Sequence, residues 1–147
     1  MIIKYRSIGE VEWARSIGGS RNEYIYSVAE TSYGRVIAGG DFFSSSIQTG
    51  EYTLTNSGVG DGMIIKYSEK ELVNIDVTKA ESVGGSSEDK IQAVVATSDG
   101  GYIAGGIFKS ASIQLGEYIL SNNSNRGTYY DGMIIKYNSS GEVEWAR

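Results

Sequence analysis

The chain has 147 residues, and its 18 acidic side chains outnumber its 13 basic ones to give a net charge of −5. Proteins that bind the phosphate backbone of nucleic acids cluster lysine and arginine, so the acidic balance argues against a nucleic-acid partner. The sequence contains no cysteine and no histidine. Disulfide frameworks, thiolate nucleophiles, zinc–sulfur sites and histidine general bases are therefore excluded.

Strand and turn residues dominate the rest of the composition. Glycine and tyrosine are abundant, at 20 and 11 residues, and proline is absent, which favours short strands joined by tight turns. No apolar run approaches the roughly 18 residues of a membrane-spanning helix, so we expect no membrane insertion. The start of the chain lacks the pattern of a signal peptide. The chain is then either cytosolic or exported by a signal carried elsewhere in a parent protein.

The sequence repeats itself along the chain. The pentapeptide MIIKY occurs at residues 1–5, 63–67 and 133–137, and residues 16–40 align with residues 82–106 at a constant spacing of 66. Differences in length between the copies fall in segments rich in Gly, Ser and Asn, where surface loops tolerate them. A fixed period of this kind indicates an architecture of repeated structural units.

Each repeat contains short runs rich in Val, Ile, Tyr and Trp, bounded by Gly, Ser, Asn or Asp, which is the punctuation of strands. Residues 46–55 and 112–120 alternate like an additional hairpin. The tetrad SDGG at residues 98–101 predicts a tight turn, because Asp–Gly accommodates the positive φ that such a turn requires. The four core strands are predicted at residues 24–31, 35–42, 61–67 and 72–82, with equivalents near Ile91, Gly101, Asp131 and Glu142.

The MIIKY strand carries apolar side chains on both faces, since alternate residues of a strand point to opposite sides. A strand buried on both faces implies sheets that stack face to face. The small residues at 38–40 and 104–106 fit a crowded position where strands converge. Four short antiparallel strands per unit, stacked radially, predict an all-β fold of antiparallel β-propeller blades. A solenoid is the alternative, although its repeats are usually shorter.

A set of turn and strand residues occurs in both copies: a Gly-Gly turn, a Val-Ala strand, a strand that contains glycine, and an Ile-Lys-Tyr strand, which a Gly turn and a Trp follow in the second copy. In the first copy they are Gly18, Gly19, Val28, Ala29, Ile37, Gly39, Ile65, Lys66 and Tyr67. In the second they are Gly84, Gly85, Val95, Ala96, Tyr102, Gly105, Ile135, Lys136, Tyr137, Gly141 and Trp145. This pattern resembles the bacterial seven-bladed β-propeller repeat family over nearly the whole chain, and departs from it at residues 72–82, where the tryptophan is missing.

The strand count predicts about two and a half four-stranded blades. Residues 1–20 form a half-blade of two outer strands, and residues 21–83 and 84–147 form complete blades. The resemblance implies a piece of a large bacterial protein, so we expect an extracellular or cell-surface location. It brings no established catalytic residues, and we expect no cofactor.

Two glutamate pairs are candidates for acid–base chemistry. Glu10 with Glu12, and Glu142 with Glu144, lie two apart in predicted strands and so share a face. Charges on an outer strand also discourage edge-to-edge pairing, and we favour that explanation. The segment SSGEVEW near Ser139 partly resembles the Ser-x-Asp-x-Gly-x-x-Trp box of sialidase-like propellers, but its aspartate is missing.

Several acidic residues near turns offer oxygen ligands for calcium. The sequence has no DxDxDG-like loop, so we favour capping of turns and predict no metal site. The acidic residues are Asp61, Glu88, Asp89, Asp99 and Asp131.

Two tyrosines in the longer loop, Tyr129 and Tyr130, are the predicted binding-loop residues. Tyrosine combines an apolar ring with a polar end and can stack on sugars or on protein partners. Most of the other tyrosines recur at repeat positions that are typical of a core.

Two classes of function remain. The first is a non-catalytic module that acts as a scaffold or binds protein or glycan through its rim loops or a central channel. The second is a fragment of a propeller-type glycan-active enzyme. The repeats favour the first class, because a catalytic site breaks the symmetry of a repeat and no carboxylate stands out in that way.

The number of blades bears on assembly, because about four to eight blades are needed to close a ring. We therefore expect the chain to contact itself in a homo-oligomeric ring, a dimer or trimer, or to contact adjacent blades of a longer parent. The alternative is a monomer whose half-blade folds back to cap one face.

Overall fold

The computed structural model describes residues 1–71, 74–124 and 128–147, and within these ranges the chain is all-β. The predicted fold class is confirmed at this level. Across the described ranges no helix is long and apolar enough to cross a membrane. The strands are β1 (Ile2–Tyr5), β2 (Val11–Arg15), β3 (Glu23–Glu30), β4 (Val36–Phe42), β5 (Ser46–Thr49), β6 (Tyr52–Thr55), β7 (Asp61–Glu71), β8 (Asn74–Val83), β9 (Asp89–Ala96), β10 (Tyr102–Phe108), β11 (Ser112–Leu115), β12 (Tyr118–Ser121), β13 (Asp131–Tyr137) and β14 (Val143–Ala146).

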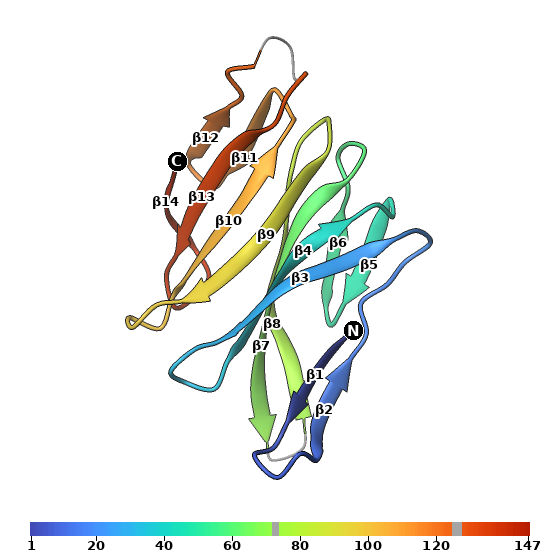
Figure 1. Cartoon of the computed structure of the whole chain (residues 1–147), viewed down its shortest axis with the longest axis vertical. Coiled ribbons are helices and arrows are strands. Elements are labelled where there is room, and N and C mark those ends of the chain that lie inside the picture. The colour runs from blue at the N-terminus through green and yellow to red at the C-terminus, as the bar shows by residue number, and fades with distance from the viewer. Residues whose placement is uncertain (72–73, 125–127) are drawn as a thin grey trace.

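The strands form two four-stranded antiparallel sheets and three two-stranded hairpins (Figure 1). The first sheet has the order β3-β4-β7-β8 and the second the order β9-β10-β13-β14. The N-terminal hairpin is β1-β2, and β5-β6 and β11-β12 are the additional hairpins that the sequence predicts. Four core strands per repeat are therefore confirmed. The predicted range of the last strand in the first repeat begins at residues 72 and 73, which lie outside the described residues.

The hairpins turn at glycines, as the sequence predicts. Gly34 and Gly100 have φ angles of 71° and 81°, in the left-handed region that favours glycine. In the predicted SDGG turn, the amide of Gly100 donates to the Thr97 carbonyl at 3.0 Å. These turns set the register of β3 with β4 and of β9 with β10.

Each sheet has two faces, defined by alternate residues. We call the front face the one that carries Ile64 in the first sheet and Ile134 in the second, and the back face the one that carries Ile65 and Ile135. Directly paired residues share a face. Gly39, which pairs with Ile64, therefore lies on the front face of the first sheet.

The front face of the first sheet packs against the back face of the second, in one hydrophobic cluster. Ile91 of the second sheet fits over two glycines of the first. A Cβ added to Gly39 would lie 2.7 Å from Ile91, and one added to Gly62 would lie 3.1 Å from it. The sequence predicts a crowded position at the small residues 38–40. The structure shows that Ile91 of the next sheet packs there.

The N-terminal hairpin packs against the back face of the first sheet. Ile2 and Trp13 are buried there in a second hydrophobic cluster. The ring of Trp13 stacks on that of Tyr67 with 6.0 Å between centroids, and Lys4 Nζ lies 3.5 Å from Glu30 Oε1. The first sheet is therefore covered on both faces. In Figure 1 the N-terminal hairpin (blue) and the second sheet (yellow to red) lie toward opposite ends of the molecule.

Candidate functional site

The two repeats differ in chemistry at one end of the sheets. Four positions at the start of β3 and β9, or at the end of β4 and β10, pair unlike residues across the 66-residue spacing. Neighbouring positions carry the same or similar residues, so these four are a local break in symmetry. The pairs are Tyr24 with Lys90, Tyr26 with Gln92, Asp41 with Ile107, and Phe43 with Lys109.

Three aromatic side chains of the first repeat gather at this place. The rings of Tyr24 and Tyr26 stack with 5.9 Å between centroids, and Phe43 meets Tyr24 edge-on at 6.3 Å. Both tyrosines are exposed. The arrangement leaves part of both tyrosine side chains open to solvent, and tyrosine suits contact with a partner that is apolar on one side and polar on another.

A cation from the second repeat, Lys90, completes the cluster. Its Nζ lies 2.8 Å from Glu88 Oε1, 3.6 Å from Asp41 Oδ2 and 5.9 Å from the centre of the Phe43 ring. The hydroxyl of Tyr130 donates to Glu88 Oε2 at 2.6 Å. We call this group the rim cluster: Tyr24, Tyr26, Asp41, Phe43, Glu88, Lys90 and Tyr130.

The two carboxylates of the rim cluster have different acidities. Burial raises the pKa of Asp41, and the nearby Lys90 ammonium opposes this effect. Hydrogen bonds from Lys90 and Tyr130 lower the pKa of Glu88. A pair split in this way resembles the acid and base of a hydrolase. Asp41, however, is fully buried, so its carboxylate is closed to a substrate on this surface.

The predicted binding-loop tyrosines have separate surroundings. Tyr130 belongs to the rim cluster, and the Lys109 ammonium lies 5.8 Å from the centre of its ring. The Tyr129 side chain is largely exposed, and its carbonyl accepts a hydrogen bond from Asn122 Nδ2 at 3.0 Å. Sequence reasoning missed Asp41, the partner of Lys90, although its replacement by Ile107 in the second repeat was a visible signal.

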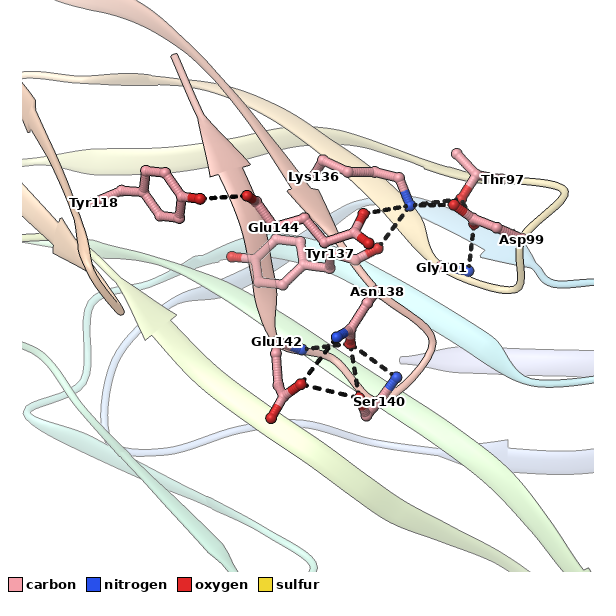
Figure 2. A network of polar contacts seen from close by, with 10 residues as sticks. All are labelled: Thr97, Asp99, Gly101, Tyr118, Lys136, Tyr137, Asn138, Ser140, Glu142 and Glu144. Atoms are coloured by element: carbon pink, nitrogen blue, oxygen red, sulfur yellow. Dashed lines mark hydrogen bonds and ion pairs between the residues drawn. The ribbon is translucent and has the colours of Figure 1, made fainter.

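The predicted glutamate pairs do not converge. Glu10 and Glu142 each lie one residue before β2 and β14, so the prediction that both members of each pair lie in a strand is wrong. Figure 2 shows Glu142 beside Asn138, whose Nδ2 donates to it at 2.9 Å, whereas Glu144 approaches Lys136 at 3.2 Å. The carboxylates serve a turn and an ion pair respectively.

Lys136 is the centre of the network in Figure 2. Its Nζ donates to Asp99 Oδ2 at 2.9 Å, to Thr97 Oγ1 at 3.2 Å and to the Tyr137 carbonyl at 2.9 Å. The hydrogen bond from Lys136 holds the pKa of the exposed Asp99 carboxyl well below its usual range. The three hydrogens of the ammonium group are thus all used in hydrogen bonds within the protein. The network therefore stabilises the β9–β10 turn.

The aspartates considered for calcium cap turns, as predicted. Asp61 accepts from the Ser57 amide at 2.9 Å, Asp89 from the Gly85 amide at 2.8 Å, and Asp131 from the Asn123 amide at 2.7 Å. In the part of the chain that the structure describes, no three acidic side chains come together in a group that could hold a metal ion.

A second candidate surface is the front face of the second sheet. Ile134 is 50% exposed there, whereas Ile64, its equivalent in the first sheet, is 1% exposed. A Cβ added to Gly105 or Gly132 would meet nothing within 4 Å. Large exposed apolar patches mark interaction sites in soluble proteins, which makes this face a candidate surface.

The sequence matches no model of a known protein family and no curated protein.

Proposed function

We propose that the chain is a non-catalytic scaffold and binding module of β-propeller-type blades, exported or held at a cell surface, whose open front face receives the next blade. One observation carries the proposal. The same isoleucine position is buried in the first sheet and half exposed in the second: Ile64 is 1% exposed and Ile134 is 50% exposed. The second sheet has the same apolar residue at this position as the first sheet, whose front face is covered by another sheet.

The shape of the open face supports the same partner. Gly39 and Gly62 seat Ile91 in the first sheet, and the corresponding glycines of the second sheet, Gly105 and Gly132, are open. A following blade of this repeat would present an isoleucine at the position of Ile91. Val95 and Trp145 add exposed apolar surface on the second sheet.

A homo-oligomeric ring, as a dimer or trimer, is the second arrangement. In such a ring, the second sheet of one copy would pack on the back face of the first sheet of the next copy, where the N-terminal hairpin already packs. Residues 133–147 differ from residues 1–15 only at positions 138 and 140, so the two segments would compete for the same surface. The packed hairpin therefore favours an adjacent blade of a longer chain over a ring of separate chains.

The test extends the chain by a second copy of residues 82–147, which continues the 66-residue register. In the chain of 147 residues, Ile134→Asp should lower the free energy of unfolding by about 1 kcal/mol or less, because the site is half exposed. In the extended chain the same change should cost several kcal/mol, because the new blade buries it. Urea unfolding measures both values.

Ile8→Asp is the control, since Ile8 is exposed at the turn of the N-terminal hairpin. It should have the same small effect in both chains. An equally small effect of Ile134→Asp in both chains would show that the front face receives no blade. Light scattering addresses the ring: a ring gives multiples of 15.9 kDa, which Ile134→Asp should reduce to 15.9 kDa.

The rim cluster favours a binding role beyond scaffolding, for a protein or glycan ligand. Its exposed tyrosines break the symmetry of the repeat, as a ligand site does. Tyr24→Ala and Tyr26→Ala should abolish any binding detected on a glycan array without changing the melting temperature. A screen with glycoside substrates separates this role from that of a glycan-active enzyme fragment. Turnover that is lost in Glu88→Gln would support the enzyme.

A further inference from the structure

Three ionisable side chains of the rim cluster meet at the junction of the two sheets. Asp41 lies in β4 of the first sheet, and Lys90 lies in β9 of the second sheet, which packs beside β4 (Figure 1). Lys90 Nζ is 2.8 Å from Glu88 Oε1 and 3.6 Å from Asp41 Oδ2. The ammonium group thus lies between two carboxylates that come from different repeats. We call Asp41, Glu88 and Lys90 the junction triad.

The backbone fixes the place of the junction triad. Gly60 of the first repeat forms a parallel bridge with Glu88, and its carbonyl accepts a hydrogen bond from the Asp89 amide at 2.7 Å. Glu88 and Lys90 lie on either side of Asp89, and residues two apart in an extended chain project to the same side. Both side chains are therefore directed from the second repeat to the first by a segment that is itself hydrogen-bonded to the first repeat.

The Asp41 carboxylate is poorly stabilised by its surroundings. Asp41 is fully buried, and neither of its side-chain oxygens accepts a hydrogen bond of normal geometry in the described part of the chain. The distance of 3.6 Å to Lys90 Nζ is too long for a hydrogen bond. Buried carboxylates in folded proteins are usually both paired and hydrogen-bonded. A reaction that removes the charge of Asp41 is favoured by this environment.

The other copy of each position lacks the ionisable group. Across the 66-residue spacing, the equivalents of Asp41, Glu88 and Lys90 are Ile107, Asn22 and Tyr24. The blade fold is therefore made without these residues in the other copies. The junction triad is a local feature that the repeat does not require, and its chemistry needs an explanation of its own.

We propose that the Lys90 amine condenses with the Asp41 carboxyl group to form an amide bond that joins the first repeat to the second, with Glu88 as the catalytic carboxylate. The new bond forms between Nζ and the Cγ atom of Asp41, and the bond from Cγ to one carboxyl oxygen breaks. One of the three ammonium hydrogens stays on the amide nitrogen, and two leave with that oxygen as water. The step consumes no other reactant.

The acidities of the three groups match these roles. Burial raises the pKa of Asp41, which favours the neutral acid that an amine attacks. Hydrogen bonds from Lys90 and Tyr130 lower the pKa of Glu88, so Glu88 remains the carboxylate that accepts a proton. The hydrogen bond to Glu88 raises the pKa of Lys90, so the amine is released only when Glu88 takes its proton. Glu88 then passes the proton to the leaving oxygen and is regenerated.

The fold supplies the proximity that the condensation needs. Reacting groups that are held within about 3–3.5 Å react much faster than the same groups in solution, and the junction triad is close to this range. The product is a neutral amide in place of a buried carboxylate and its ammonium partner. The bond closes a loop between residues 41 and 90 and restricts the unfolded chain, as a disulfide does. This inference goes beyond the scaffold and binding roles and does not depend on them.

The test is the intact mass of the full chain, purified as the folded protein and then denatured. The amide should lower the mass by that of one water molecule relative to the sequence. Trypsin should not cleave after Lys90, because its ammonium group is lost. The digest should instead contain a branched peptide in which the segment with Asp41 is joined to the segment with Lys90, and fragmentation identifies the two joined residues.

Conservative variants test each role. Lys90→Arg keeps a positive charge beside both carboxylates but forms no amide, because a guanidinium group does not lose its proton, and it should have the full mass of its sequence. Glu88→Gln should slow the loss of water by about 100-fold or more, because it removes the proton acceptor. Lys109→Arg is the matched control, since the Lys109 ammonium lies 5.8 Å from the centre of the Tyr130 ring, and it should lose water as the unchanged chain does. Circular dichroism verifies that each variant is folded.

Asp–Gly pairs are another source of water loss, because they can close to a succinimide with the same change in mass. The sequence has such pairs at residues 61–62, 99–100 and 131–132. A succinimide would form in Lys90→Arg and in a chain kept in urea, whereas the amide requires Lys90 and the folded junction triad. Equal water loss in Lys90→Arg and the unchanged chain would overturn the cross-link. So would a folded, unchanged chain that keeps its full mass for several days.

Discussion

The first and second sheets have nearly the same strand sequences, pairing and additional hairpin, yet their fronts have different surroundings. The front face of the first sheet is shielded from solvent because Ile91 and Val94 of the second sheet pack on it. The front of the second sheet keeps the same glycines and the same isoleucine in contact with solvent. Burial in this protein is thus a property of neighbouring sheets. Matched substitutions at equivalent positions measure what a neighbour contributes.

The largest difference is expected between Ile64→Asp and Ile134→Asp. A buried unpaired carboxylate costs several kcal/mol, out of a total stability of about 5–15 kcal/mol, so Ile64→Asp should leave the chain largely unfolded. Ile134→Asp should keep the fold, with a loss of about 1 kcal/mol or less. Urea denaturation followed by circular dichroism compares the two. Similar midpoints would mean that the sheets do not stack as described.

The next effect concerns pH. Asp61 is buried against Gly84 where the first sheet meets the second repeat, and burial raises its pKa to about 6. The folded chain holds this proton up to about pH 6, whereas the unfolded chain releases it near pH 4. The free energy of unfolding should therefore fall by about 1–3 kcal/mol as pH rises through this window.

Asp61→Asn tests the assignment, because an amide has no proton to release in this range. The variant should be more stable than the unchanged chain at about pH 8, and the difference should vanish near pH 4. Thermal unfolding across this range gives the two curves. Parallel curves for the two proteins would assign the pH dependence to other groups.

A smaller contrast is expected between two glycines on the front faces. Gly39→Ala places a methyl group 2.7 Å from Ile91 and 2.8 Å from Val94, which should cost about 1–3 kcal/mol through overpacking. Gly105→Ala meets nothing within 4 Å and should be neutral or stabilise by about 0.4–1 kcal/mol, because alanine restricts the unfolded chain. Differential scanning calorimetry resolves opposite signs. A destabilised Gly105→Ala would mean that the front of the second sheet is already occupied.

The smallest effects are expected at the outer strands. Glu12 lies 3.3 Å from Lys4 and Glu144 lies 3.2 Å from Lys136. Lys4 and Glu12 are partly exposed, and Lys136 keeps its hydrogen bond to Asp99 when Glu144 is changed. Glu12→Gln and Glu144→Gln should therefore each change the free energy of unfolding by about 0.5 kcal/mol. Ile65→Asp, at a fully buried site, provides the unfolding reference. A loss above about 2 kcal/mol in either glutamate variant would assign it a buried role.

The strands were predictable because local signals agree with the repeat. The alternation in MIIKY places Ile64 and Ile65 on opposite faces, and both are buried. The same pattern could not predict that Ile134 is half exposed, because its exposure depends on a neighbouring sheet and not on its strand. The bounds of the outer strands were also out of reach: β2 and β14 begin after Glu10 and Glu142, since the preceding turns take those residues.

The rim cluster was predictable only in part. The loop position of Tyr130 indicated a binding residue, but its contact with Glu88 joins segments 42 residues apart. Asp41 was not among the carboxylates considered in the sequence, because its partner Lys90 belongs to the other repeat. Comparison of the copies position by position would have found it, since Ile107 stands at its equivalent.

Because the first sheet packs between the N-terminal hairpin and the second sheet, the parts of the molecule should differ in how often they unfold locally. Strands with one covered face lose fewer contacts when they detach, so the N-terminal hairpin should open most often, and the second sheet should open without disrupting the first. The slowest amide exchange should then be found in β4 and β7, which are central in their sheet and covered from both sides. The first sheet should therefore stay folded while amide hydrogens in the N-terminal hairpin and the second sheet exchange with solvent.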